Sequence, residues 1–317
     1  MTSTVLPHQR VQARVRDMLT AALGPVGPLL HDDTVIEIMT NPDGAVWVER
    51  LGEPPRPSGA WLDPGTVEHI LRLVASSIGA ECHAGAPSVS AVLPGDGARF
   101  QGFVPPVVTQ PAFVIRKKAL RVFTLEDYVE DGTMTPEHAL ALEDAVLTCK
   151  NIVIAGGTGS GKTTLANAIL VLIAATGDRI VTIEDTPELQ CTAPNHLALY
   201  TRDGVATMQQ LVKETMRCRP DRIIVGEVRD GAGLDLLKAW GTGHPGGCAT
   251  VHANGARQSL TRLEQLVQEA VVTVPRALIA EAVNLIVYLE RTPRGRRVQC
   301  LTAVTDMVGD AYVVEDL

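Results

Sequence analysis

The sequence has a deficit of positive charge. Its 317 residues include 36 acidic side chains against 28 lysines and arginines, which gives a formal net charge of -8 at pH 7. A protein that follows a long stretch of nucleic-acid backbone needs a broad basic surface. Direct nucleic-acid binding is therefore disfavoured.

Two further absences narrow the class of protein. The six cysteines include no C-x-x-C pair, which excludes a zinc ribbon and a redox motif and favours free thiols in a reducing compartment. No apolar run approaches the roughly 20 residues that span a bilayer. The first residues also lack a basic segment that leads into an apolar signal core. We therefore expect a cytoplasmic protein.

Length and composition predict two globular domains. The chain exceeds the roughly 100 to 200 residues of a single domain, and 45% hydrophobic with 20% charged residues is ordinary globular usage. The pattern of helix-like and strand-like runs in residues 1–118 predicts a smaller α+β domain. Its expected elements are a helix over Gln9–Ala22, a hairpin of Val35–Thr40 and Ala45–Arg50, a helix over Pro64–Ile78, a hairpin of Ser88–Leu93 and Ala98–Val104, and a strand over Ala112–Lys117.

The first predicted helix is amphipathic and admits two interpretations. Arg10 and Arg14 lie one turn apart, outside an apolar stripe. The stripe can pack on its own domain, or the basic helix can contact a membrane surface. The residues of the stripe are Val11, Val15, Met18, Leu19 and Ala22.

A polar, acidic stretch with weak periodicity predicts a linker over residues 119–135. Beyond it, residues 136–317 alternate short apolar strands with helices, which is typical of an α/β domain with a largely parallel sheet. A final hairpin is expected around Pro293-Arg294-Gly295. The strands are expected over Asn151–Ala155, Arg179–Ile183, Arg222–Gly226, Leu285–Arg291 and Val298–Val304.

The strongest motif is a phosphate-binding loop. Gly156–Leu165, GGTGSGKTTL, matches G-x-x-x-x-G-K-[ST] between a predicted strand and a predicted helix. Its glycines let backbone N–H groups face phosphates at a helix N-terminus. We expect Lys162 to reach the β and γ phosphates of ATP, Thr163 to bind Mg²⁺ and Thr164 to support the α phosphate. The predicted nucleotide-binding residues are Gly156, Gly157, Thr158, Gly159, Ser160, Gly161, Lys162, Thr163 and Thr164.

Two later strands deliver carboxylates at their carboxyl ends, the edge where open parallel sheets bind ligands. Glu184 and Asp185 follow the strand that ends at Ile183, and we expect them to face Mg²⁺. Glu227 follows Gly226, where an aspartate would usually bind the metal. Glu227 is the candidate that orients the attacking water.

Two histidines lie in and just after a glycine-rich turn further along the chain. His244 lies within Gly241–Gly247, and His252 follows a short strand over Cys248–Val251. A single histidine is more often structural. Two in this arrangement favour a sensor that couples the state of the phosphates to neighbouring segments.

In this order, the clusters resemble the secretion and pilus motor ATPases. These share a Walker A loop, an acidic "Asp box", a Gly-Glu form of Walker B and a "His box". Within them, the chain is most similar to the TrbB-like conjugative-transfer ATPases of type IV secretion. The similarity also covers Gly97-Ala98-Arg99, Pro105-Pro106, Ile115-Arg116-Lys117 and Met216–Asp221.

The resemblance implies a P-loop (RecA-like) ATPase domain in a cytoplasmic ring of six subunits. The ring would lie peripherally at the inner membrane, bind components of a secretion or conjugation machine, and power pilus assembly or transfer of a DNA–protein substrate. The resemblance also implies that Arg99 and Arg116 of the N-terminal domain reach the nucleotide phosphates. Arg217 or Arg219 would act across a subunit border.

Two other functions are compatible with a phosphate-binding loop. A P-loop kinase would need a mobile basic lid and an acceptor pocket, and the sequence offers no separate lid segment. A nucleotide-gated scaffold would bind ATP with little turnover, and Glu227 argues directly against it. Phosphate release measured with and without acceptors separates the three functions.

Overall fold

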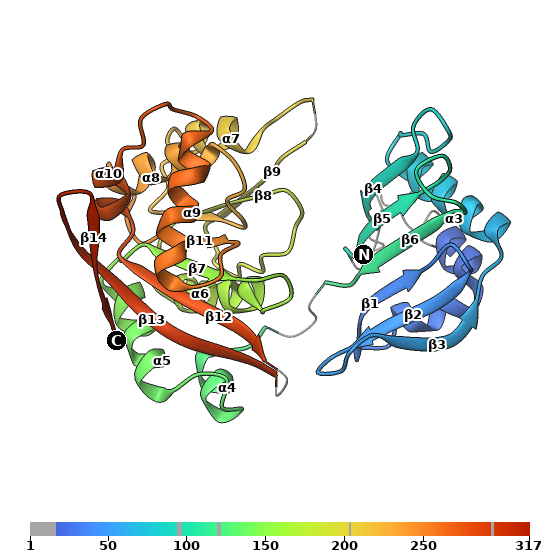
Figure 1. The fold of residues 1–317 in the computed structure, drawn as a ribbon, viewed down its shortest axis with the longest axis horizontal. Helices are drawn as coiled ribbons and strands as arrows, with labels where there is room; N and C mark the ends of the chain where they lie inside the picture. The colour runs from blue at the N-terminus through green and yellow to red at the C-terminus, as the bar shows by residue number, and fades with distance from the viewer. Residues whose placement is uncertain (1–16, 94–96, 119–121, 203, 293–294) are drawn as a thin grey trace, which may run out of the picture. The chain divides into compact units, whose positions relative to one another are not determined.

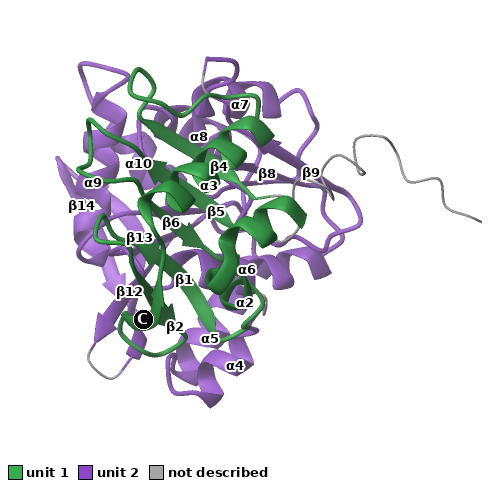
Figure 2. Cartoon of the chain, turned by 90° about the vertical axis from the view of Figure 1, so that its right-hand side faces the viewer, with its two compact units in different colours: residues 1–120 green, residues 121–317 purple. Residues whose placement is uncertain are grey.

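The computed structural model describes residues 17–317 apart from 94–96, 119–121, 203 and 293–294. The chain forms two compact units that divide between Leu120 and Arg121, coloured separately in Figure 2. Each unit has its own sheet, and among the described residues the buried hydrophobic side chains form one core in unit 1 and two in unit 2.

Unit 1 is built on an antiparallel six-stranded sheet with the order β3-β2-β1-β6-β5-β4 (Figure 1). Both predicted hairpins and the predicted strand at Ala112 are present. An edge strand, β3, was not predicted, because its segment contains a proline and a glycine that sequence patterns assign to loops. The strands are β1 Val35–Thr40, β2 Ala45–Arg50, β3 Arg56–Trp61, β4 Ser88–Val92, β5 Arg99–Phe103 and β6 Ala112–Arg116.

The helix α3, Pro64–Ser77, covers one face of this sheet. The side chain of Asp63 caps its start by accepting from the Thr66 backbone N–H at 3.0 Å. Its apolar face packs on buried residues of β4, β5 and β6. At Gly102 a Cβ would lie 1.9 Å from Cδ2 of Leu71, so glycine is required where the helix meets the sheet.

The first predicted helix, Gln9–Ala22, is described in part. Residues 9–16 lie outside the described residues, whereas 17–23 are helical. Leu19 is buried as expected, but Met18, placed on the same stripe, is 48% exposed. The helical residues are followed by two short helices, η1 Gly24–Val26 and α2 Gly27–Leu30.

Unit 2 is an α/β unit with an eight-stranded sheet in the order β14-β13-β12-β7-β11-β10-β8-β9. The strands from β12 to β9 pair in parallel, and β12, β13 and β14 pair antiparallel. The predicted parallel sheet and closing hairpin are therefore present. The strands are β7 Ile152–Gly156, β8 Ile180–Glu184, β9 His196–Tyr200, β10 Arg222–Val225, β11 Cys248–Val251, β12 Leu285–Thr292, β13 Gly295–Val308 and β14 Ala311–Asp316.

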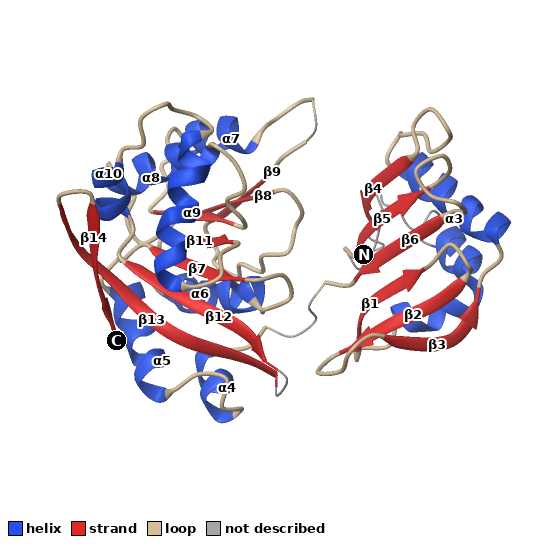
Figure 3. Ribbon diagram, in the orientation of Figure 1, coloured by secondary structure: helices blue, strands red, loops and turns tan. Residues whose placement is uncertain are grey.

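Helices cover both faces of this sheet (Figure 3). On the central strand β7, Ile152 and Ile154 belong to one core and Val153 and Ala155 to the other, so the strand is apolar throughout. The first core contains residues of α4 Leu125–Glu130, α5 Pro136–Leu147 and α6 Lys162–Ala175. The second contains residues of α7 Met208–Thr215, α8 Ala232–Gly241, α9 Ala256–Gln268 and α10 Arg276–Ala282.

The segment predicted as a linker, residues 119–135, differs from the expectation. It contains α4, whose capping box pairs Thr124 with Asp127. Leu125, Tyr128 and Met134 are buried in the core of unit 2. These apolar contacts make most of the segment part of the second unit.

In the described part of the chain, no helix combines the length and the apolar character that crossing a bilayer requires.

Candidate nucleotide site

The loop predicted to bind phosphates connects β7 to α6, the strand and helix position expected from the sequence. Gly159 and Gly161 have φ of 71° and 100°, the left-handed region that favours glycine. A Cβ at Gly156 would lie 2.6 Å from the carbonyl oxygen of Leu289. Gly159 and Gly161 are needed for their backbone conformation, and Gly156 is needed because a side chain would clash with Leu289. With glycine at these positions, the loop can turn tightly between the strand and the helix.

The start of α6 leaves its first turn without a side-chain cap. Its N-cap, Gly161, has no side chain to bond the first-turn N–H groups, and such groups suit phosphate oxygens. Lys162 is 7% exposed, and its Nζ donates to the carbonyl oxygens of Gly156 and Gly157, each at 2.9 Å. The ammonium group therefore lies inside the loop, close to where phosphates would be bound.

A carboxylate that the sequence analysis did not single out faces the predicted Mg²⁺ residue. The hydroxyl of Thr163 donates to Oε2 of Glu188 at 3.2 Å. Asn167 of α6 holds the same loop, because its side chain donates to the Glu188 carbonyl and accepts from the Gln190 N–H. Glu188 lies four residues beyond the end of β8, so only the fold of the loop brings it back to α6.

Glu184 has a different environment from the one expected. It is 3% exposed, and its Oε1 accepts from the backbone N–H groups of Glu188 and Leu189 at 2.9 and 2.7 Å. These bonds shape the loop that carries Glu188. The geometry thus favours a positioning role for Glu184 and makes Glu188 the stronger candidate to face the metal.

Glu227 follows β10 and is held through both carboxylate oxygens. Oε1 lies 2.8 Å from Nε2 of His252, and Oε2 accepts from Nε of Arg229 at 2.7 Å. Arg229 also contacts Asp185, with Nη1 3.3 Å from Oδ2. The predicted residues Glu227, His252 and Asp185 thus form one network, with Arg229 as the link that the sequence analysis did not assign.

The charges of this network act on its titratable members. Burial lowers the pKa of His252, and the positive charge of Lys162 lowers it further, against the opposing effect of Glu227. Burial lowers the pKa of Arg229. The hydrogen bond to Glu227 and the negative charge of Glu227 raise this pKa by more, so that it lies above its ordinary value. Both Lys162 and Glu227 act on His252, so the loop and the end of β10 belong to one electrostatic site.

The structure separates the two histidines. His252 follows β11, beside Glu227, whereas His244 precedes that strand and places Nδ1 2.9 Å from the carbonyl oxygen of Pro220. His244 therefore lies at the opposite end of β11 from Glu227. The spacing of the two histidines in the sequence did not show that they lie at opposite ends of β11.

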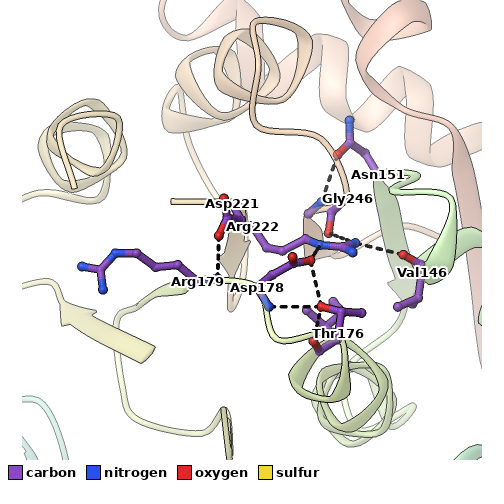
Figure 4. Close-up of polar contacts among 10 residues, drawn as sticks. Val146, Asn151, Thr176, Asp178, Arg179, Asp221, Arg222 and Gly246 are labelled. Atoms are coloured by element: carbon purple, nitrogen blue, oxygen red, sulfur yellow. Dashed lines mark hydrogen bonds and ion pairs between the residues drawn. The ribbon is translucent and has the colours of Figure 1, made fainter. Parts of the chain in front are cut away.

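A buried arginine holds the glycine-rich turn that contains His244 (Figure 4). Arg222 is 3% exposed; its Nε donates to Asp178 at 2.7 Å, and its Nη1 donates to the carbonyl oxygens of Val146 and Gly246 at 3.0 and 3.3 Å. A Cβ at Gly246 would lie 2.3 Å from Nη1 of Arg222. The side-chain oxygen of Asn151 accepts a further hydrogen bond, at 3.0 Å, from the backbone N–H of Gly247, the residue after Gly246. The turn is thereby fixed to the amino ends of β7 and β10.

The predicted arginines occupy two other places. Arg217 and Arg219 are exposed and precede β10, at the opposite end of that strand from Glu227. In unit 1, Arg99 of β5 and Arg116 of β6 are direct cross-strand partners, and Arg116 also faces Glu37 of β1. Burial raises the pKa of Glu37, whereas the charge of Arg116 lowers it. The two arginines therefore form one basic row across neighbouring strands.

The donor set suits nucleotide phosphates with Mg²⁺. Among the described residues, no three His, Cys, Asp or Glu side chains are grouped to hold a metal by themselves. Mg²⁺ commonly takes only one or two protein oxygens and completes its shell with water and phosphate oxygens. The Thr163 hydroxyl and the Glu188 carboxylate fit this pattern.

Comparisons with known proteins match nearly the whole chain. The family model "Type II/IV secretion system protein" matches residues 21–301. "Conjugal transfer protein TrbB" of Rhizobium radiobacter is 50% identical over 310 residues, 97% of this chain and 94% of that protein. "Type IV secretion system protein VirB11" of Bartonella quintana is 34% identical over 303 residues, covering 83% and 84%. The Legionella pneumophila ATPase DotB has a similar fold, with a TM-score of 0.63, 16% identity and coverage of 88% and 79%.

Proposed function

Because this chain belongs to the type II/IV secretion system protein family, we propose that ATP hydrolysis at its phosphate-binding loop powers pilus assembly or transfer of a DNA–protein substrate. The chain is a secretion-type ATPase, with relatives in conjugal transfer and type IV secretion. The network that joins Glu227 to His252 and Arg229 beside the loop is the observation that carries the proposal.

Each residue of the site has a distinct task in this proposal. Lys162 and the first-turn N–H groups of α6 bind the phosphates. Thr163 and Glu188 hold Mg²⁺, which neutralises charge on the phosphates when bound. Glu227 orients the attacking water, and His252 and Arg229 keep its carboxylate in one orientation. Glu184 and Asp185 support this set through the loop after β8 and through Arg229.

We further propose that the chain works as a homohexamer at the inner membrane, in contact with components of the secretion machine. The exposed Arg217 and Arg219 would then act across a subunit border, where each ring interface can complete a neighbouring site. Negative-stain images of purified protein with ATP test the ring. Six-fold particles support it, and a monomer at working concentration would rule it out.

His252 and His244 are expected to differ in their effect on turnover. His252→Ala removes a direct partner of Glu227, so turnover should fall about tenfold. Nucleotide affinity should stay near that of the wild type, because Lys162 and the first-turn N–H groups of α6, which bind the phosphates in this proposal, do not change. His244→Ala should have a smaller effect, through the turn held by Arg222. Steady-state phosphate release measures the turnover of each variant, and nucleotide titration measures its affinity.

His252→Gln is the matched variant, because its amide can still donate to Glu227. Recovery of turnover with this variant supports a positioning role for the His252 donor. Equal rates in wild type and His252→Ala would remove His252 from the site.

Arg116→Ala is expected to lower turnover at saturating ATP by at least about tenfold, since an arginine that stabilises transferring charge can contribute roughly 10³ to 10⁵ in rate. Arg99→Ala should be milder. The measurement is steady-state ATPase activity on hexamers verified by size. Arg72→Ala is the control, because Arg72 is an exposed arginine of the same unit on α3. Wild-type maximal rates in both Arg116→Ala and Arg99→Ala would contradict the prediction that these arginines reach the nucleotide phosphates.

A further inference from the structure

Two arginines face each other across the β12–β13 hairpin at the rim of the phosphate-binding loop. Arg291 of β12 and Arg296 of β13 are direct cross-strand partners. Like charges in this position destabilise a strand pair, so a hairpin that keeps them needs compensating contacts on the same face. The next pair inward on that face, Leu289 and Val298, is buried in the core that also contains α6.

Both side chains lie against the glycines of the loop. Nε of Arg296 donates to the carbonyl oxygen of Gly159 at 3.1 Å. A Cβ at Gly159 would lie 3.6 Å from Nη1 of Arg291, and one at Gly161 would lie 3.2 Å from Cδ of Arg296. The arginine pair therefore packs on the two glycines whose left-handed conformations shape the loop.

We propose that Arg296 is a positioning residue for nucleotide binding and that Arg291 supports it with positive charge. By holding the Gly159 carbonyl toward the hairpin, Arg296 keeps the loop in the shape that turns backbone N–H groups toward the phosphates. The two guanidinium groups also make this rim attractive to a polyanion. The inference rests on the proposed ATPase function and adds the hairpin to the nucleotide site.

The ligand class follows from the position of the contact. Arg296 bonds the loop backbone rather than any residue assigned to the γ phosphate. If the loop loses this shape, its affinity for ADP and its affinity for ATP should therefore fall by the same factor. The hydrolytic step should change little once nucleotide is bound, because Glu227 and its partners belong to other segments.

The chain offers a matched control beside Arg296. Arg297 is the next residue of β13 and is also exposed, but its cross-strand partner is Glu290 and its side chain projects from the other face of the hairpin. Arg297→Gln thus removes the same charge from the same strand. Comparing it with Arg296→Gln separates the specific contact with the loop from the general charge of the hairpin.

The test is titration of each variant with fluorescently labelled ADP and with ATP, followed by KM and kcat. Arg296→Gln should weaken binding of both nucleotides about tenfold, the change expected if the bound loop loses the full contribution of one charge-assisted hydrogen bond. KM should rise with little change in kcat. Arg291→Gln should have a smaller effect, and Arg297→Gln should bind like the wild type. Arg296→Lys should recover part of the affinity, because it keeps the charge without the planar fork.

The outcomes of this test are distinguishable. Wild-type affinity in Arg296→Gln, or equal weakening in Arg297→Gln, overturns the inference. A fall in kcat with unchanged nucleotide affinity also overturns it. If Arg296→Gln does not fold, Arg291→Gln and Arg296→Lys decide the same question. Failure of the wild-type protein to bind either nucleotide would instead count against the proposed function.

Discussion

Replacing Lys162 by alanine should abolish measurable ATP hydrolysis. Its Nζ is buried within the loop and is held by two loop carbonyl oxygens at 2.9 Å. Phosphates bound at the start of α6 would lie beside this group. Removing it takes away the closest positive charge as charge is redistributed on the transferring phosphoryl group, so turnover should fall by about 10² to 10³ or more.

Lys150→Ala is the matched control for this substitution. Lys150 is an exposed lysine just before β7, outside the loop, and its loss should leave turnover unchanged. Phosphate release at saturating ATP compares the two variants, and melting temperatures confirm that both are folded. Near-normal turnover in folded Lys162→Ala would overturn the assignment of the site.

Glu227→Gln should bind ATP and hydrolyse it about a hundredfold more slowly, or slower still. The substitution keeps the size of the side chain but removes the charge that orients and activates water. The amide can still occupy the space between His252 and Arg229, so the phosphate ligands are undisturbed. We expect protein incubated with ATP to retain ATP rather than ADP.

Asp230→Asn is the control for Glu227→Gln. Asp230 lies three residues further along the same loop, and its carboxylate accepts from the Ala232 N–H at 2.9 Å near the start of α8. It should hydrolyse ATP at nearly the wild-type rate. If Glu227→Gln loses ATP binding as much as turnover, Glu227 is a binding residue and another group must orient the water.

Local signals made the strand–loop–helix unit around residues 156–165 predictable from the sequence. Its residues are consecutive, and the glycines, the lysine and the flanking apolar runs all indicate the same strand–loop–helix unit. Glu188 was not singled out because its contact with Thr163 depends on a loop that folds back onto α6. Arg291 and Arg296 were missed for a similar reason, since they come from a hairpin more than a hundred residues beyond the loop.

The predicted linker shows how a polar segment can hide a packed one. The stretch around α4 carries acidic residues and weak periodicity, which favoured a linker. Its capping box, Thr124 with Asp127, was a readable helix signal. The buried Tyr128 and Met134 depend on the rest of unit 2 for their partners. Burial of this kind is a tertiary property, so the boundary of the unit could not be placed from composition.

The most direct test of the central claim, that hydrolysis at this site powers transfer, is the frequency of DNA transfer from donor cells. The only copy of the protein in these cells carries Lys162→Ala, and Lys150→Ala serves as the control at equal protein levels. The account predicts that Lys162→Ala lowers transfer to the background of cells lacking the protein, while Lys150→Ala transfers normally. Wild-type transfer frequency from Lys162→Ala donors would contradict it.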